Sequence, residues 1–329
     1  MLLRILSILS MPLVLFGTAA LFVDGPEAKS LRALLALTFA GASLYLLFFH
    51  RSRRTGCAGF FGLLGLVLVW WVQIPPQQDR PWMADVAHPA EAVIEGSRLT
   101  IRNVRNFHYR SETDFDVNWE TRTWNLDQLL GVNLVLSYWG SPYIAHTIMS
   151  WEFAEGPPLA ISIETRKEEG ESYSAVLGFF RQYELYYVVA DERDVLGVRS
   201  NYRGEDLYMY RLNLDPATAR ALLLDYVEGI NALAVDPAWY NAAAQNCTTT
   251  IRVHMQHVGR GNFWDPRLLV NGRIDELGYE RGALDGSLPM AELRAKSRFD
   301  EKVSGSPLDG DYSRRIREGL PGGFAEPQP

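Results

Sequence analysis

Three apolar runs near the start of the chain constrain its architecture more than any other feature. They are Ile5–Val23, Ala33–Phe49 and Cys57–Ile74, and none contains a side chain that is charged at pH 7. Each has close to the roughly 20 residues that an α-helix needs to cross a bilayer. Three successive runs without a polar face do not fit a buried hairpin of a soluble core. The sequence therefore predicts three transmembrane helices, with a cleaved signal peptide as the alternative for the first.

Basic residues between the runs predict how these helices are oriented. Arg51, Arg53 and Arg54 separate the second run from the third with no acidic residue beside them, whereas residues 24–29 carry both charges. Short loops rich in Lys and Arg stay in the cytoplasm. We therefore expect the third helix to lead the rest of the chain out of the cytoplasm.

The remainder of the chain has the composition of a globular domain. The formal net charge is −7 and no basic stripe is present, which argues against a nucleic-acid partner. Prolines stiffen residues 75–81, and Gly, Pro and charged residues gather after about residue 270, where we expect loose packing. The predicted divisions are an anchor at 1–76, a linker at 77–94, a domain at 95–270 and a partly ordered tail at 271–329.

Within the domain the pattern of apolar and polar residues predicts an α+β fold. Strands are indicated by partial alternation and by turn residues such as those at 155–158, which close a hairpin. The first helix is marked by Asp215 as its cap and Pro216 at its first position. The expected strands are 99–109, 115–124, 133–139, 145–153, 159–166, 184–190 and 206–212, and the expected helices are 216–233 and 247–258.

Cys247 is the candidate nucleophile of this domain. The only other cysteine, Cys57, lies in an apolar run, so a disulfide between the two is not expected. Helical spacing after Cys247 places the thiol at a helix start, where backbone N–H groups and the helix dipole favour a thiolate. The same N–H groups could stabilise an oxyanion. The alternative is a buried, inert thiol.

His146 is the candidate base, because a thiolate nucleophile needs an imidazole partner. It lies at the start of an expected strand, and a strand end can face a helix N-terminus across a cleft. His108, on an earlier strand, is the reserve candidate. The alternative for His146 is a structural, hydrogen-bonded histidine.

Glu164 is the candidate third member, which would orient the imidazole. If the hairpin closes at the Gly-Pro-Pro turn, Glu164 lies roughly opposite Ile148, and Ser162 shares its face. The alternative is a solvated strand face. Asn246, Ser162 and Trp151 are the candidate substrate-binding residues.

Other polar clusters give weaker signals. His254 and His257 have a spacing that suits a metal on one helix face, but the sequence shows no third ligand, so no metal and no cofactor are expected. Four arginines could meet lipid phosphates, although the interleaved acidic residues favour local salt bridges. The arginines are Arg193, Arg199, Arg203 and Arg211.

Several stretches together resemble one known family, the Lnb N-terminal periplasmic domain family, from about Val117 to His257. This family is bacterial and membrane-associated, and its bacteroidal namesake is a lipoprotein N-acyltransferase. The order of histidine before a helical cysteine also resembles circularly permuted papain-like enzymes, including relatives of lecithin:retinol acyltransferase. The stretches that carry the family resemblance are Ser162–Glu168, Tyr173–Leu185, Asp191–Val195, Tyr240–Asn241 and Asn246–Thr249.

The resemblance implies a permuted papain-like domain with an antiparallel sheet, held in the periplasm by a bacterial inner-membrane anchor. It implies Cys247 as nucleophile, His146 as base and Glu164 as third member. The expected function is a cysteine acyltransferase that moves an acyl chain from a membrane lipid ester to an amine, with a lipoprotein as the possible acceptor. Two alternatives stay open: a papain-like peptidase or amidase, and a non-catalytic module that binds lipid or peptide.

Overall fold

The apolar runs fold into helices in the computed structural model, which describes residues 2–261, 264–268 and 270–324. The chain forms two compact units. The first contains Met1–Arg80, Ser172–Glu184 and Trp239–Ala242. The second contains Pro81–Glu171, Leu185–Ala238 and Ala243–Pro329.

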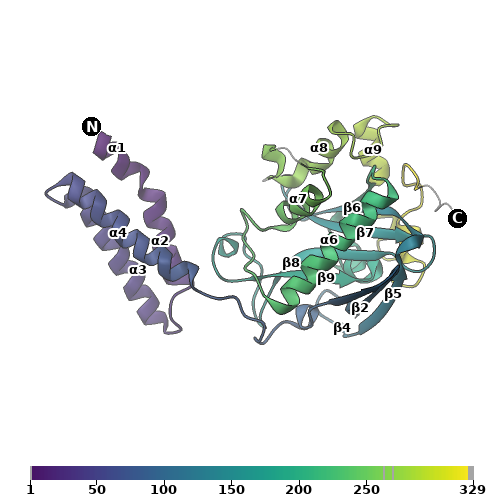
Figure 1. Ribbon diagram of the computed structural model, residues 1–329, viewed down its shortest axis with the longest axis horizontal. Helices are drawn as coiled ribbons and strands as arrows, with labels where there is room; N and C mark the ends of the chain where they lie inside the picture. Colours follow the sequence, from purple (N-terminus) through teal and green to yellow (C-terminus); the bar gives the residue numbers. More distant parts are fainter. Residues whose placement is uncertain (1, 262–263, 269, 325–329) are drawn as a thin grey trace. The chain divides into compact units, whose positions relative to one another are not determined.

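The first unit contains three helices of the length and composition of membrane spans, Leu3–Val23, Lys29–Phe49 and Arg53–Val72. The prediction of three apolar helices is confirmed (Figure 1). Pro12 follows a break at Ser10, so the first span consists of two helical segments. The helices are α1 (Leu2–Leu9), α2 (Met11–Val23), α3 (Lys29–Leu44), the π-helix η1 (Tyr45–Phe49), α4 (Arg53–Val72) and the 3-10 helix η4 (Leu177–Phe179).

Asp24 ties the segment 172–184 to the spans within this unit. Its carboxylate accepts hydrogen bonds from the Trp71 indole at 2.6 Å and from the Gln182 amide at 2.9 Å. The backbone N–H of Arg181 donates to the same carboxylate at 3.2 Å, and the Arg181 guanidinium lies over the Trp71 ring at 4.4 Å. Asp24 therefore lies on the same side of the spans as the segment 172–184.

The second unit is built on an eight-stranded sheet in the order β1-β2-β9-β8-β7-β6-β10, with β5 paired to β2. An antiparallel sheet was predicted, but the sheet is mixed, because β2 and β9 pair in parallel through Arg105 and Ala190. The strands are β1 (Glu91–Glu95), β2 (Arg98–Arg105), β5 (Trp119–Asn125), β6 (Leu129–Tyr138), β7 (Ala145–Phe153), β8 (Leu159–Arg166), β9 (Glu184–Ala190) and β10 (Asp206–Arg211). A separate hairpin pairs β3 (His108–Tyr109) with β4 (Phe115–Asp116).

Two helices cover one face of the sheet. Figure 1 shows α6 (Pro216–Val235) running across the strands, with α7 (Cys247–His257) beside it. On β7, Trp151 packs against Tyr226 of α6 with ring centroids 5.0 Å apart, and Thr147 meets Thr248 of α7. Odd-numbered residues of β7 therefore face these helices, while even-numbered residues face the other side.

The C-terminal segment covers the opposite face. Ile148 of β7 shares one buried cluster with Phe299, Tyr312 and Ile316. The expectation that residues after 270 pack loosely was therefore wrong for these core residues. The remaining short elements of this unit are α5 (Glu192–Val195), α8 (Ile274–Glu280), α9 (Met290–Ser297), α10 (Asp300–Val303), α11 (Tyr312–Arg315), η2 (Ala84–Val86), η3 (Leu126–Gln128), η5 (Arg199–Arg203), η6 (Pro266–Leu268) and η7 (Asn271–Arg273).

Candidate active site

Cys247 is the first residue of α7, and a capping box fixes this helix start. The side chain of Asn246 accepts a hydrogen bond from the Thr249 backbone N–H at 2.9 Å, and the Thr249 hydroxyl accepts one from the Asn246 N–H at 2.9 Å. The N–H groups of Cys247 and Thr248 lie in the first turn, where a helix supplies no acceptor. The structure gives the amide oxygen of Asn246 a capping role, and substrate binding by Asn246 stays a prediction.

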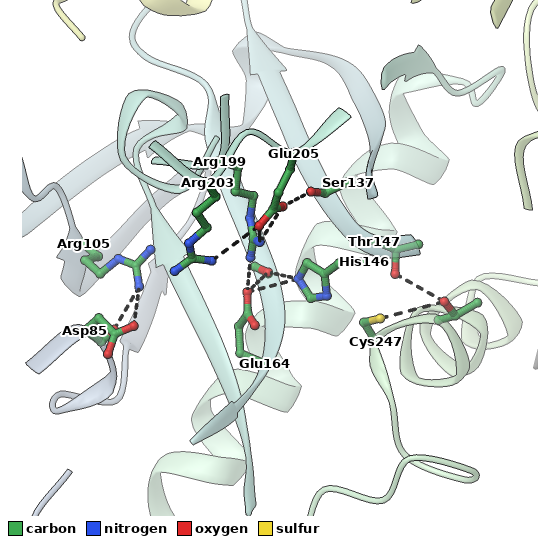
Figure 2. Close-up of polar contacts among 12 residues, drawn as sticks. Asp85, Arg105, Ser137, His146, Thr147, Glu164, Arg199, Arg203, Glu205 and Cys247 are labelled. Atoms are coloured by element: carbon green, nitrogen blue, oxygen red, sulfur yellow. Dashed lines mark hydrogen bonds and ion pairs between the residues drawn. The ribbon is translucent and has the colours of Figure 1, made fainter. Parts of the chain in front are cut away.

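The structure brings together the histidine and the acidic residue predicted for the site. His146, near the start of β7, has its Nε2 atom 3.1 Å from a carboxylate oxygen of Glu164. The same Nε2 atom lies 2.7 Å from the Ser162 hydroxyl, which in turn donates to Glu164 at 2.7 Å. The side chains of His146 and Glu164 point toward each other in Figure 2.

The predicted register of this hairpin was wrong by two residues. Ile148 pairs with Ser162, not with Glu164. The same antiparallel register, continued by two residues, puts Glu164 opposite His146. A two-residue shift leaves every side chain on its face, because strand side chains alternate with period two. The predicted grouping of His146 with Glu164 therefore survives the error, and the two lie closer than expected.

The imidazole of His146 lies between Glu164 and the sulfur of Cys247 (Figure 2). Burial alone would lower the pKa of His146, but the charges of Glu164 and Cys247 outweigh it and raise this pKa to about 9. Burial would likewise raise the pKa of the Cys247 thiol, but the charge of His146 and a hydrogen bond from it lower this pKa to about 7. The pair thus favours thiolate and imidazolium together.

Arg199, at the start of η5, extends the network beyond Glu164. It donates to Glu164 at 2.8 Å and to Glu205 at 3.1 Å, and the Ser137 hydroxyl donates to the same oxygen of Glu205. Burial would raise the pKa of Glu164, but His146, Arg199 and Ser162 hold it well below its usual range. The salt-bridge interpretation of Arg199 is confirmed, although the sequence did not connect it with the site.

Residues around the thiol fix the positions of β7 and α7. The Thr147 side chain and backbone hydrogen-bond to the Cys247 sulfur and help to lower its pKa. Asn271 donates to the Ala145 carbonyl at 2.6 Å, accepts from the Ala145 N–H at 2.9 Å, and donates to the Thr248 hydroxyl at 2.5 Å. Asn271 therefore joins the two elements that carry His146 and Cys247, and sequence reasoning had assigned it to the tail.

Tyr226 of α6 presents a buried hydroxyl near the thiol. Its side chain is fully buried, and the hydroxyl has no hydrogen-bond partner among the described residues. Burial, and to a smaller extent the charges of Tyr187 and Cys247, hold the pKa of Tyr226 well above its usual range, so the hydroxyl stays protonated.

Trp151, predicted to bind substrate, is instead fully buried and donates its indole N–H to the Ala219 carbonyl at 3.1 Å. Its burial gives Trp151 a packing role and does not support substrate contact.

A cavity of about 380 Å³ lies along α7, and its wall includes Thr248, the residue next to Cys247, but not Cys247 itself. Thr147 and Thr248, the two neighbours of the Cys247 sulfur, form part of its wall, and the Thr248 hydroxyl lies 3.9 Å from that sulfur. Ligand pockets of roughly 300–1,000 Å³ with mostly apolar walls are usual for small molecules. Apolar residues form most of the remaining wall, among them Leu134, Met149, Ile251, Met255, Leu277 and Leu284.

The other histidines of this unit lie elsewhere. His108, the reserve base, is exposed and lies 3.1 Å from the guanidinium of Arg193. The ring of His88 contacts Trp119 with centroids 5.4 Å apart. His254 and His257 both contact Asp225. Of these histidines, only His146 has the geometry predicted for the base.

Comparison with known proteins identifies the part of the chain that holds this geometry. A family model, described as the Lnb N-terminal periplasmic domain, matches residues 115–272. These residues form an Lnb N-terminal periplasmic domain.

The Lnb N-terminal domain thus includes His146, Glu164, Arg199 and Cys247, and the match extends beyond the 117–257 resemblance to include Asn271. The three apolar helices precede it, so the chain is a membrane protein with a periplasmic domain. No curated protein and no solved structure matches the chain.

Proposed function

We propose that the Lnb N-terminal domain of this chain is a cysteine acyltransferase that moves an acyl chain from a lipid ester to an amine. Cys247 is the nucleophile, His146 the general base and acid, and Glu164 the group that orients the imidazole. The observation that carries the proposal is the buried Cys247–His146 pair beside an apolar cavity. A structural histidine and an inert thiol would not need the mutual shift of pKa values that favours thiolate and imidazolium.

The reaction follows in two halves. The Cys247 thiolate attacks the ester carbonyl while His146 holds the thiol proton. The tetrahedral intermediate then expels the lipid alkoxide, which takes that proton, and leaves an acyl-thioester on Cys247. In the second half an amine attacks the thioester, His146 accepts the amine proton, and the thiolate leaves as the amide forms. The products are a lysolipid and an N-acylated acceptor.

Donors around the sulfur suit the oxyanion of each intermediate. The first-turn N–H groups of Cys247 and Thr248 lack helical acceptors, and such groups stabilise developing negative charge. The Tyr226 hydroxyl is buried without a partner among the described residues, although an unsatisfied buried hydroxyl destabilises a fold by about 1–3 kcal/mol. A substrate oxygen would supply the missing acceptor.

The cavity suits an acyl chain better than a peptide, because its wall is largely apolar and it begins beside Thr248. Arg252 and Arg260 also line it, and the buried Nε of Arg252 has no hydrogen-bond partner among the described residues. A phosphate headgroup would pair with these guanidinium groups. These features favour a phospholipid donor over the peptidase alternative.

The proposed location is the periplasmic face of the bacterial inner membrane. The segment 172–184 belongs to the matched periplasmic domain, and its residues Arg181 and Gln182 contact Asp24 at the end of the first span. This contact supports a periplasmic first loop and a cytoplasmic loop at Arg51–Arg54. A permuted papain-like fold, with its histidine strand before its cysteine helix, is part of the same proposal.

The test is a two-substrate assay with full-length protein in detergent. The donor is a phospholipid with a labelled acyl chain, and the acceptor is a synthetic peptide with an N-terminal diacylglyceryl-cysteine. We expect label in a hydroxylamine-resistant amide, with loss by several orders of magnitude in Cys247→Ser and in His146→Ala. The double variant should be little worse than either, because residues that act as a unit are non-additive. Cys57→Ala, which removes the other cysteine, is the matched control and should keep activity.

Three results would contradict the proposal. Full activity of Cys247→Ser would exclude the thiol mechanism. Cleavage of peptides without consumption of lipid would favour the peptidase. Lipid binding that is equal in wild type and Cys247→Ser, with no turnover in either, would favour the binding module.

A further inference from the structure

Asp225 supplies the third ligand that the His254 and His257 pair lacked in the sequence. Asp225 lies on α6, and both histidines lie on the last turns of α7. The Nδ1 atom of His254 is 2.5 Å from one carboxylate oxygen of Asp225, and the Nδ1 atom of His257 is 2.9 Å from the other. The three ligand atoms all lie within 4.8 Å of one another.

The surroundings of the cluster hold the ligands in place from one side. His254 is buried, its Nε2 atom lies 2.6 Å from the Tyr187 hydroxyl, and its ring stacks on Tyr226 with centroids 4.0 Å apart. Metal-bound histidines commonly use the second ring nitrogen in such an outer hydrogen bond. The His257 side chain is 58% exposed, which leaves solvent access from the other side.

We propose that Asp225, His254 and His257 bind a divalent transition-metal ion of the Zn²⁺ type, with water as the fourth ligand. Two imidazole nitrogens and one carboxylate oxygen suit such ions, whereas Mg²⁺ and Ca²⁺ prefer sites made of oxygen ligands. Each neutral ring would carry its proton on Nε2 and ligate through Nδ1. The Nε2–H of His254 would then donate to the Tyr187 hydroxyl.

The movement required of the carboxylate is small. Ligand atoms at about 2.0–2.1 Å from a tetrahedral Zn²⁺ stand roughly 3.4 Å apart. The Asp225 oxygens are closer to the two nitrogens than that, so the carboxylate would withdraw by less than roughly 1 Å as the ion enters. A bound ion would join α6 to α7 and fix the helix whose first residue is Cys247. The proposal does not depend on the acyl-transfer chemistry.

The test measures zinc binding by full-length, tag-free protein in detergent, with Cys247→Ser as the background so that the thiol cannot bind the metal. After removal of metal by a chelator, equilibrium dialysis with Zn²⁺ should give one saturable ion per chain. Co²⁺ should give the absorption bands of a tetrahedral site without a thiolate band. Added Mg²⁺ or Ca²⁺ should not compete.

Three variants separate ligation from folding. His257→Gln changes an exposed side chain and should weaken Zn²⁺ binding by at least about tenfold. Tyr187→Phe, which removes only the outer hydrogen bond, should weaken it by roughly 10- to 100-fold. His108→Gln removes an exposed histidine outside the cluster and should leave affinity unchanged. At a Zn²⁺ concentration of 100 times Kd, the ion should lower the unfolding equilibrium constant about 100-fold in the background protein.

The contrary results are equally clear. No saturable binding in the background protein would mean that the cluster is a hydrogen-bonded link between α6 and α7 only. Binding that is unaffected by His257→Gln would place the ion elsewhere. Either result overturns the proposal.

Discussion

Glu164→Gln removes the charge that holds the His146 imidazolium while keeping a hydrogen-bond acceptor of the same shape. In the wild type the pKa of His146 is about 9 and that of Cys247 is about 7. Because each charge stabilises the other, these pKa values favour thiolate with imidazolium over the neutral pair. Arg199 keeps its partner Glu205 in the variant, so no guanidinium is left unpaired in the core.

Loss of the Glu164 charge should bring the pKa of His146 below that of the Cys247 thiol. Burial would then lower the pKa of His146, and the pKa of the Cys247 thiol should return toward its ordinary value of 9.0. At pH 7 the thiolate fraction, and with it the rate of alkylation by iodoacetamide, should fall on the order of 10- to 100-fold.

The assay is the alkylation rate of Cys247 as a function of pH in a Cys57→Ala background, which leaves Cys247 as the only cysteine. The wild-type inflection should lie near pH 7, and Glu164→Gln should move it toward pH 9. Glu205→Gln, which alters Arg199 but not the imidazole, is the matched control and should move it less. An inflection that stays near pH 7 in Glu164→Gln would refute the reasoning.

Other predictions follow from the same geometry. The profile of kcat/KM against pH should be bell-shaped. Activity should rise through about pH 7 as the Cys247 thiol ionises, and it should fall through about pH 9 as His146 loses the proton that the leaving group needs. A profile that keeps rising past pH 9 would contradict catalysis by a thiolate–imidazolium pair. Tyr226→Phe should lower kcat by roughly 10²-fold, as expected for one oxyanion donor, without loss of thermal stability; unchanged kcat would remove Tyr226 from the site. A reporter active only outside the cytoplasm should be active when fused after Pro76 and silent when fused after Arg54, and the reverse pattern would exclude a periplasmic domain.

Local patterns predicted the elements that carry the site. The Gly-Pro-Pro turn set the hairpin, and β7 and β8 have the predicted limits of 145–153 and 159–166. Asp215 caps α6 with Pro216 in its first turn, and α7 begins at Cys247 as predicted. These features are encoded within a few residues of chain, so caps, turns and periodicity suffice to find them.

Contacts between residues far apart in the chain could not be predicted from the sequence. Glu164 and Arg199 are separated by 35 residues, and Asp225 and His254 by 29, so no spacing rule links them. The parallel pairing of β2 with β9 depends on a crossover that no local signal specifies. Strand β1 (Glu91–Glu95) lies almost entirely in the segment 77–94 that was predicted to be a linker, and it pairs antiparallel with β2 over five residues. The cavity likewise draws its wall from several separate segments.

The central claim is that Cys247 carries an acyl group during turnover. Full-length protein incubated with phospholipid of a single defined acyl chain, without an amine acceptor, should be stopped with acid and measured by intact mass spectrometry. We expect a mass increase of one such acyl chain that maps to Cys247, disappears on treatment with hydroxylamine and is absent from Cys247→Ser. An adduct on another residue, or unmodified protein in a preparation that still transfers acyl chains, would contradict the account.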